Sequence, residues 1–229
     1  MWNNFVSERF DVHFKKSEVK TSNETVYSLD ESSYTHINYH SMKEALRQLT
    51  LVDKDFYRIV ETGCSSHGTK STLLWDKFVN FYDGEVVSVD LDKKAVEEAS
   101  RMTSEKTRVV HGNSLDYLGS HESAIDFLYL DSYDVDFLNP RPSAEHHLLE
   151  FNKVKHLLHK DSLILIDDTP VSPLWLDNGI YNNIYMEYME SFDPNMSGKG
   201  SLVNLELEKM GAEKILHEYQ ILWKVVNPL

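Results

Sequence analysis

The sequence is poor in cysteine and has no long apolar run. Its 229 residues include one cysteine, so no disulfide can form within the chain and a reducing compartment is expected. No apolar stretch approaches the roughly 18 residues that a membrane-spanning helix requires. The N-terminal residues lack the basic region and apolar core of a secretory signal peptide. We therefore expect a cytoplasmic protein with no membrane partner.

Basic residues are scarce relative to acidic ones. The chain has 23 Lys and Arg against 37 Asp and Glu, a net charge of −14, and no long Lys/Arg cluster offsets it. Such a charge repels a phosphate backbone, so a nucleic-acid partner is not expected. Internal repeats, low-complexity segments and interdomain linkers are also lacking. The remaining composition, 41% hydrophobic and 26% charged, is that of a globular protein, for which one domain is the most economical organisation.

Short apolar runs alternate with helical patterns along the chain. The expected strands are 58–62, 85–90, 107–111, 125–130, 162–167, 213–218 and 220–226. The expected helices are 41–49, 70–82, 93–103, 114–119, 143–159 and 201–210. This alternation predicts an α/β fold with a mostly parallel sheet and helices on both faces. The last two strands lie too close in sequence for a crossover helix, so they should form an antiparallel hairpin.

A glycine-bearing loop links the first strand to a helix, as in several nucleotide-binding folds. In a P-loop, lysine directly follows the second glycine, whereas Thr69 separates Gly68 from Lys70 here. That spacing places the lysine on the phosphates, so the insertion counts against a P-loop. The closely spaced glycines of a dinucleotide loop are also missing. A plain strand-to-helix turn and a loop for S-adenosylmethionine (SAM) remain.

SAM carries no phosphate but has an amine, a ribose diol and an adenine. An acidic residue before the loop, Glu61, suits the amine, and Gly63 lets the backbone approach the nucleoside. Asp90 ends the next strand, where a carboxylate can accept hydrogen bonds from a ribose diol. Asn113 and Ser114 follow the third strand and offer groups for an adenine edge, although a helix cap explains them equally well. These residues together favour SAM.

The order of these motifs resembles that of class I SAM-dependent methyltransferases. The resemblance covers about residues 41–226 and rests on Val60-Glu61-Thr62-Gly63, Val89-Asp90, Gly112-Asn113-Ser114, Leu130-Asp131-Ser132-Tyr133-Asp134 and Leu165-Ile166-Asp167-Asp168. It implies a Rossmann-like, doubly wound, seven-stranded, mostly parallel sheet with a C-terminal antiparallel hairpin. By position it implies SAM contacts at Glu61, Gly63, Ser65, Ser71, Asp90, Asn113, Ser114 and Asp131.

Three aspartates follow the fourth and fifth strands. Asp131 comes directly after one apolar run, and Asp167 and Asp168 close the next. Neighbouring strands lie about 4.8 Å apart, so these carboxylates could surround one ion, and hard oxygen ligands suit Mg²⁺, or Mn²⁺ or Ca²⁺. The alternative is that they are strand-end residues exposed to water. The pattern resembles metal-dependent O-methyltransferases of the catechol and caffeoyl-CoA type and macrocin-type sugar O-methyltransferases, which implies that these aspartates hold a divalent metal.

The general base and the acceptor are less defined. Catechol-type enzymes have a lysine three residues after the first metal aspartate, where this chain has Asp134. This departure counts against a phenolic acceptor and leaves Asp134, His146 and His147 as candidate catalytic residues beside Asp131. The resemblance implies a hydroxyl of a small molecule, sugar or glycan as the acceptor.

Two segments are expected to cover the site within a single domain. Residues 1–40 would form an N-terminal covering segment, 41–168 the SAM-binding core, 169–200 a lid or acceptor-binding insertion, and 201–229 a terminal helix and hairpin. The insertion contains Trp175, Tyr181, Tyr185 and Tyr188, which could stack on an acceptor, form a satellite core or contact a second copy in a homodimer. Lys199, between two glycines, would be a mobile cation near the site or part of a plain loop.

The sequence predicts a SAM-dependent O-methyltransferase assisted by a divalent metal. One alternative is a methyltransferase-fold protein that binds SAM or a partner without catalysis. A second is a P-loop-like NTPase or kinase, in which Leu163 to Asp168 would be the acidic strand that holds Mg²⁺.

Overall fold

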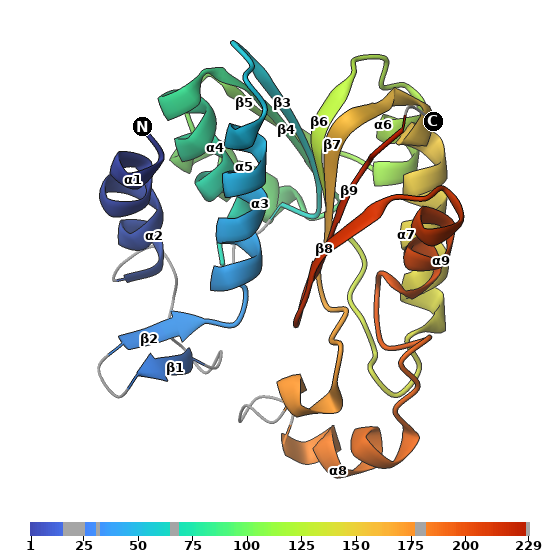
Figure 1. Cartoon of the computed structure of the whole chain (residues 1–229). Helices are drawn as coiled ribbons and strands as arrows, with labels where there is room; N and C mark the ends of the chain where they lie inside the picture. Colours follow the sequence, from blue (N-terminus) through green and yellow to red (C-terminus); the bar gives the residue numbers. More distant parts are fainter. Residues whose placement is uncertain (16–25, 31–32, 65–68, 177–181, 228–229) are drawn as a thin grey trace.

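The computed structural model describes residues 1–15, 26–30, 33–64, 69–176 and 182–227. Its centre is a seven-stranded sheet in the order β5-β4-β3-β6-β7-β9-β8 (Figure 1). The strands are β3 (Tyr57–Thr62), β4 (Gly84–Asp90), β5 (Thr107–His111), β6 (Ile125–Leu130), β7 (Leu158–Ile166), β8 (Glu213–His217) and β9 (Ile221–Lys224). The first five are parallel, and β9 runs antiparallel to both β7 and β8. The predicted sheet and terminal hairpin are therefore confirmed.

Alternate residues of each central strand face opposite sides of the sheet, as the strand geometry requires. Ile59, Phe127 and Leu165 belong to one buried cluster, whereas Val60, Leu128 and Ile166 belong to another. Because both faces are buried, the central strands are continuous apolar runs, which is why their positions can be predicted from sequence.

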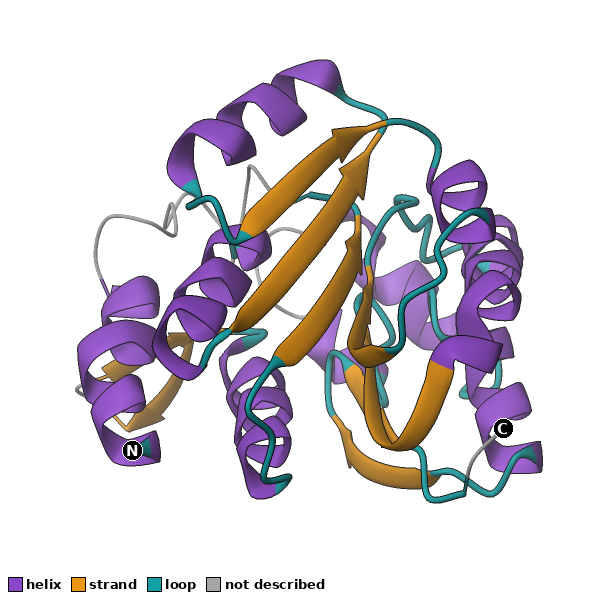
Figure 2. Cartoon of the chain, turned by 90° about the horizontal axis from the view of Figure 1, so that it is seen from above, coloured by secondary structure: helices purple, strands orange, loops and turns teal. Residues whose placement is uncertain are grey.

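Helices cover both faces of the twisted sheet (Figure 2). The helices α3 (Tyr39–Leu51), α4 (Ser71–Tyr82) and α5 (Lys93–Met102) lie on one side (Figure 1). The other side carries α6 (Ser114–Gly119), α7 (Arg141–Val154) and α9 (Ser201–Lys209). Asp92 caps α5 by accepting the Lys94 N–H, and α9 ends before Gly211, whose φ of 70° is the left-handed conformation common after helix ends.

The N-terminal segment is more ordered than its sequence pattern predicts. It forms α1 (Trp2–Phe5), a π-helix (Val6–Phe10), α2 (Asp11–Lys15) and a hairpin of β1 (Val26–Asp30) and β2 (Ser33–His36). Phe5 and Phe10 are fully buried in the same cluster as α3 and α4, and the ring of Phe5 meets that of Phe78 edge-on at 5.5 Å. The first helices are therefore part of the core rather than only a cover for the site.

The boundary predicted between the helix 143–159 and the strand 162–167 is wrong. The helix α7 ends at Val154, a short 3₁₀ turn, η2 (Lys155–Leu157), follows, and β7 begins at Leu158, which pairs with Ile125. Apolar residues at the end of the helical pattern thus enter the sheet instead. Asp161, with a φ of 72°, interrupts the regular extension within this long strand.

The insertion after β7 contains its own structure, namely η3 (Pro173–Leu176), a 3₁₀ turn, and α8 (Asn182–Ser191). Figure 1 shows α8 and the β1–β2 hairpin beyond the carboxyl ends of the parallel strands. Among the described residues, no helix combines the length and apolar character that crossing a membrane would require.

Candidate active site

The carboxyl ends of β3 and β6 meet at Gly63. This residue has a φ of 83°, and a Cβ added to it would lie 2.3 Å from the carbonyl oxygen of Asp131. The Asp131 N–H donates to the carbonyl oxygen of Thr62 at 2.9 Å, and the Gly63 N–H donates to that of Val89 at 2.8 Å. Only glycine accommodates both the positive φ and this close approach. The loop after β3 is therefore held directly against the loop that begins with Asp131.

A cavity lies at the carboxyl ends of these strands, where Gly63 follows β3 and Asp90 ends β4. It is lined by Gly63, Val89, Asp90, Leu91, Gly112, Ser114, Ser132, Tyr133 and His146. Gly63, Asp90 and Ser114 of the predicted SAM contacts thus share one cavity. Asn113 does not line it, because its side chain caps α6 by accepting the Leu115 N–H at 2.8 Å. Ser65 lies outside the described residues.

The sequence predicts that Glu61 contacts the SAM amine directly, but the structure engages its carboxylate within the protein. Its side chain is fully buried, and both carboxylate oxygens accept hydrogen bonds within the protein. The donors are Ser71 at 2.6 Å, Thr72 at 2.6 Å, Trp75 at 2.9 Å and Ser88 at 2.5 Å. Burial raises the pKa of Glu61, and these donors oppose that shift. The predicted contact of Ser71 is affected too, because its hydroxyl is directed at Glu61 and away from the cavity.

The lysine of the loop does not occupy a phosphate-binding position. Lys70 is the N-cap residue that precedes α4 and has a φ of 48°, and its Nζ lies 3.9 Å from the sulfur of Met102 on α5. Lys70 lines neither the cavity above nor the cleft described below. Residues 65–68, which complete the loop, lie outside the described residues. The placement of Lys70 gives no support to the P-loop alternative.

The three aspartates predicted to form a metal site do come together. Asp131, Asp167 and Asp168 each offer a carboxylate oxygen, and these oxygens all lie within 4.8 Å of one another. Two of the three also line an open cleft with Gly63, Cys64, Asp90, Asp92, Ala95, Ser132, Asp134 and Lys199. This cleft shares Gly63, Asp90 and Ser132 with the first cavity, so the two are adjacent. We call the three side chains the carboxylate cluster.

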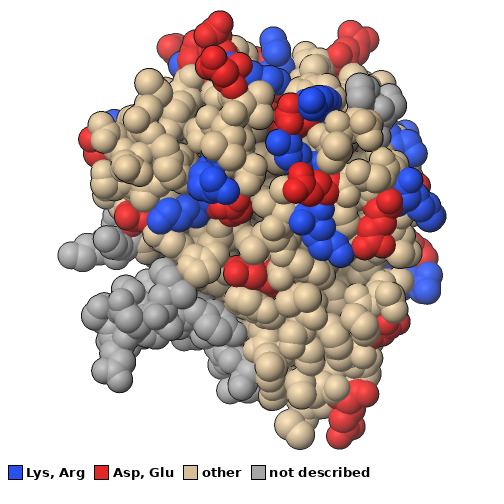
Figure 3. Space-filling view, in the orientation of Figure 1, with Lys and Arg blue, Asp and Glu red and all other residues tan. Residues whose placement is uncertain are grey.

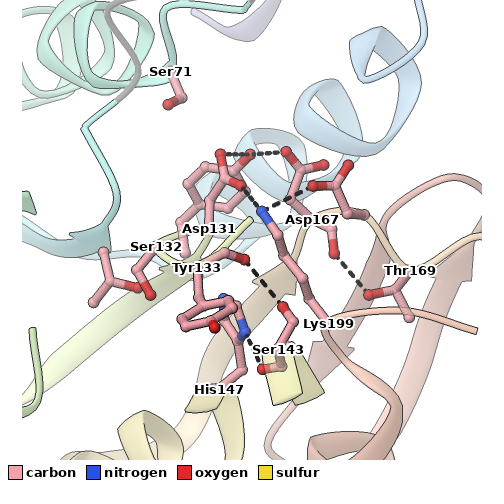
Figure 4. A network of polar contacts seen from close by, with 12 residues as sticks. Ser71, Asp131, Ser132, Tyr133, Ser143, His147, Asp167, Thr169 and Lys199 are labelled. Atoms are coloured by element: carbon pink, nitrogen blue, oxygen red, sulfur yellow. Dashed lines mark hydrogen bonds and ion pairs between the residues drawn. The ribbon is translucent and has the colours of Figure 1, made fainter. Parts of the chain in front are cut away.

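Lys199 enters the carboxylate cluster from the loop before α9 (Figure 4). Its Nζ lies 2.6 Å from Oδ1 of Asp131 and 2.8 Å from Oδ2 of Asp168, and the side chain is only 2% exposed. Lys199 was expected to be a mobile cation or part of a plain loop. The structure instead places it in a buried, doubly ion-paired position.

Neutral donors complete the cluster. Tyr129 donates from its hydroxyl to Oδ2 of Asp167 at 3.1 Å, and Gln220 donates to Oδ1 of the same residue at 2.8 Å. Tyr219 donates its hydroxyl to Oδ1 of Asp168. Gln220 is oriented in turn by Ser41 of α3, whose hydroxyl donates to Oε1 at 2.5 Å. The aspartates are therefore partly enclosed rather than simply exposed to water.

Burial and mutual repulsion dominate the electrostatics of the cluster. Burial raises the pKa of Asp131 well above its usual range, Lys199 opposes this shift, and Asp167 and Asp168 add to it. The pKa of Asp167 is raised for the same reasons, burial first and Asp168 second. Burial disfavours the charge on Lys199, but the three aspartates outweigh it and hold its pKa well above the ordinary value. A cation is thus favoured among these carboxylates.

The three residues considered as a base lie in different surroundings. Asp134 is exposed and lines the cleft of the cluster. His146 lines the other cavity, where its ring lies 5.2 Å from that of Tyr133 and its Nε2 lies 3.2 Å from Glu150. His147 is fully buried, its Nδ1 donates to the Ser143 carbonyl oxygen at 2.7 Å, and burial lowers its pKa to about 4. Only Asp134 lies in the cleft with the carboxylate cluster.

The aromatic residues of the insertion form a satellite core. Tyr188 packs with Ile37, Phe137, Leu176 and Tyr219, and Trp175 and Tyr185 pack against this group. The Tyr188 hydroxyl donates to the Ser197 carbonyl oxygen at 3.1 Å. Of the alternatives for these aromatics, packing is therefore what the described residues show. Tyr181 lies outside the described residues.

Solved structures of other proteins have a similar architecture. MycE methyltransferase from the mycinamycin biosynthetic pathway, solved in complex with Mg, S-adenosylhomocysteine and mycinamycin VI, superposes with a TM-score of 0.57 at 13% identity. The match covers 84% of this chain and 50% of that chain. The chain has the fold of SAM-dependent methyltransferases. The predicted resemblance is thus confirmed at the level of the fold.

A second methyltransferase matches over nearly its whole length. The N-methyltransferase NodS from Bradyrhizobium japonicum WM9 gives a TM-score of 0.50 at 11% identity, covering 83% of this chain and 96% of that chain. In contrast, this chain spans about half the length of MycE. No family description and no curated protein matches the sequence.

Sequence reasoning missed several polar residues within this methyltransferase fold. Besides Tyr129, Tyr219 and Gln220 around the aspartates, it overlooked Glu150, which accepts from Thr62 at 3.0 Å and from Ser132 at 2.6 Å. Tyr129 could have been found from the sequence, because residues two positions apart in a strand point to the same face of the sheet, and Tyr129 lies two positions before Asp131. Gln220 and Glu150 could not have been found, since their positions depend on how β9 and α7 pack.

The surface gives one further observation on partners. On the face shown in Figure 3, the described Lys and Arg side chains are interspersed with Asp and Glu side chains. That face presents no continuous basic area among the residues described. The expectation of no nucleic-acid partner and that of a homodimer both stay predictions.

Proposed function

We propose that this protein is a SAM-dependent O-methyltransferase that transfers a methyl group to a hydroxyl of a small molecule, sugar or glycan, assisted by a divalent metal. The observation that carries the proposal is that two spaces lie side by side at the carboxyl ends of the strands of a methyltransferase-type sheet and share Gly63, Asp90 and Ser132 in their linings. One is lined by Asp90 and Ser114, and the other by two aspartates of the carboxylate cluster. A donor and an acceptor bound there would meet near Gly63.

SAM would occupy the cavity at the ends of β3, β4 and β5. Asp90 would accept hydrogen bonds from the ribose diol, as an acidic residue at this strand end does in dinucleotide folds. Ser114 and the rings of Tyr133 and His146, which are tilted by 38° to one another, border the same cavity and suit an adenine. Glu61 would act indirectly, by fixing the start of α4 through Ser71 and Thr72.

The donor set of the carboxylate cluster suits a hard divalent cation. Three carboxylate oxygens within 4.8 Å are ligands that Mg²⁺ or Mn²⁺ accepts, and Asp131 and Asp168 open onto the cleft where water and an acceptor could complete the shell. When bound, such an ion lowers the pKa of an acceptor hydroxyl and orients its oxygen. Support also comes from MycE, a structural neighbour that was solved with Mg.

The residues of the chain would contribute to catalysis mainly by positioning the acceptor. Methyl transfer is an in-line displacement, so holding the acceptor oxygen behind the methyl group supplies much of the acceleration. Asp134 is the candidate to accept the hydroxyl proton, because it lines the cleft of the cluster. His147 would stay neutral, with its Nδ1 fixed on Ser143.

Removing Asp90 should weaken SAM binding selectively. We expect Asp90→Ala to raise the dissociation constant about 10- to 100-fold, which corresponds to losing hydrogen bonds to a charged group. Calorimetric titration of SAM measures this directly. The matched control is Asp116→Ala, which removes one exposed acidic side chain from α6 outside the cavity and should leave the affinity unchanged. Equal affinities for the two variants would contradict the ribose role.

The proposed methyl transfer and its dependence on a metal are tested separately. Incubation with SAM, Mg²⁺ and pools of sugars or phenols should yield S-adenosylhomocysteine, and a chelator should suppress it. Product formation that persists in chelator would refute the metal role and leave the methyltransferase role intact. SAM binding without product from any pool would favour the non-catalytic alternative.

A further inference from the structure

The most unusual feature of the site is a lysine where a metal ion is expected. The Nζ of Lys199 lies within 2.8 Å of carboxylate oxygens from both Asp131 and Asp168. These are two of the three residues whose oxygens converge in the carboxylate cluster. A cation that bridges the two carboxylates is therefore already part of the chain (Figure 4).

The backbone fixes Lys199 in this position. A Cβ on Gly198 would lie 1.8 Å from the carbonyl oxygen of Asp168, so only glycine permits the two loops to approach this closely. The Lys199 N–H donates to that same oxygen at 3.0 Å, and the Gly200 N–H donates to Oγ1 of Thr169 at 2.8 Å. The loop that carries Lys199 is thus hydrogen-bonded to the strand end that carries the aspartates.

The charges around Lys199 explain why an ammonium is stable there. Within the cluster the other donors are a tyrosine hydroxyl or an amide, so among the described contacts Lys199 supplies the positive charge that faces the three carboxylates. An ion pair in such a site is costly to break, because a partner left alone is a buried and unpaired charge. Any incoming metal ion must compete with this ammonium for the same oxygens.

We propose that Lys199 is a resident counter-cation, which a divalent ion must displace from Asp131 and Asp168 in order to bind. This inference rests on the proposed function, since it takes the carboxylate cluster to be the metal site. The displaced ammonium can turn into the adjoining cleft, which Lys199 lines together with Asp134. Metal binding would then move Lys199 toward the space proposed for the acceptor.

The test compares Mn²⁺ binding to the complete chain with and without this lysine. Lys199→Met keeps an unbranched side chain one atom shorter than lysine and removes the charge. We expect it to bind Mn²⁺ about 100-fold more tightly than the unaltered protein in calorimetry. The matched control is Lys224→Met. Lys224 also pairs with one aspartate, Asp161 at 2.8 Å, but it lies on β9 opposite Leu163, away from the end of β7 that precedes Asp167 and Asp168. This control should bind Mn²⁺ like the unaltered protein.

Other outcomes separate the inference from the proposed function. Equal Mn²⁺ affinities in Lys199→Met and the unaltered protein would overturn the inference and leave the metal role standing. Absence of Mn²⁺ binding in both would overturn the inference and the metal role together, while SAM binding, measured separately, decides the methyltransferase role.

A second measurement uses the unaltered protein, in case Lys199→Met does not fold. The buried Lys199 should react slowly with acetic anhydride, and saturating Mn²⁺ should raise its acetylation at least about 10-fold by releasing the ammonium, as followed by mass spectrometry. Unchanged acetylation of Lys199 at saturating Mn²⁺ would overturn the inference.

Discussion

Glu61→Ala is expected to lower the free energy of unfolding by about 3–5 kcal/mol, the cost of leaving several buried donors without an acceptor. Four donors surround this carboxylate, and all of them lose their partner together. One of them is the indole N–H of Trp75, one of the four tryptophans of the chain. Denaturant unfolding followed by tryptophan fluorescence measures the loss of stability.

A neighbouring glutamate provides the control for this variant. Glu85 lies on the adjacent strand and pairs with Arg58 at 3.3 Å, but its side chain is 49% exposed. Glu85→Ala should therefore change the free energy of unfolding by less than about 1 kcal/mol. If the two variants were equally stable, the role of Glu61 as the structural anchor of α4 would be wrong.

For Glu61, the sequence motif predicts the place of the residue in the strand but not the hydrogen bonds of its side chain. Glu61 lies near the end of β3, as the sequence predicts, but its side chain lines neither the cavity nor the cleft. Its four partners could not be foreseen in full, because Ser88 belongs to β4 and reaches Glu61 only through the pairing of the two strands. Ser71, Thr72 and Trp75 did carry a signal, since residues one turn apart on a helix share a face.

For the aspartates, in contrast, the order of the strands alone was sufficient to predict that the side chains lie close together. Asp131 and Asp167 follow apolar runs that become neighbouring parallel strands, and the carboxyl ends of such strands lie at one edge of the sheet. Their convergence was therefore predictable without any side-chain geometry. Lys199 was not, because the approach of its loop depends on close backbone contacts at Gly198 rather than on a hydrophobic period.

The structure of the N-terminal segment could not be predicted, for a different reason. Its aromatic residues have no clean helical or strand period, yet Phe5 and Phe10 are fully buried against α4 and α3. A π-helix over Val6–Phe10 shifts the side chains out of the ordinary helical register, so a search for the 3.6-residue period misses them. Local geometry, rather than composition, determined this part of the fold.

Asp131→Asn is expected to reduce methyl transfer at least about 100-fold, in the range found when one charge-stabilising group is removed from an active site. The amide keeps the shape of the side chain but cannot hold a metal ion or pair with Lys199 as a carboxylate does. The measurement is the rate of S-adenosylhomocysteine formation with an acceptor identified from the pools above. SAM affinity should change little, because the cavity lined by Asp90 and Ser114 is untouched.

The thermal midpoint of the same variant distinguishes loss of function from loss of fold. Burial and two neighbouring carboxylates raise the pKa of Asp131, so its negative charge is unfavourable in the folded protein. Lys199 keeps its ion pair with Asp168 in this variant, so no buried charge is left without a partner. Removing the Asp131 charge should therefore leave the midpoint unchanged or raise it, as is common where function requires an unfavourable arrangement. Asp136→Asn, an exposed position in the same loop, should affect neither rate nor midpoint. A lower midpoint for Asp131→Asn would instead mean that the carboxylate stabilises the fold, and that Lys199 needs all of its partners to stay buried.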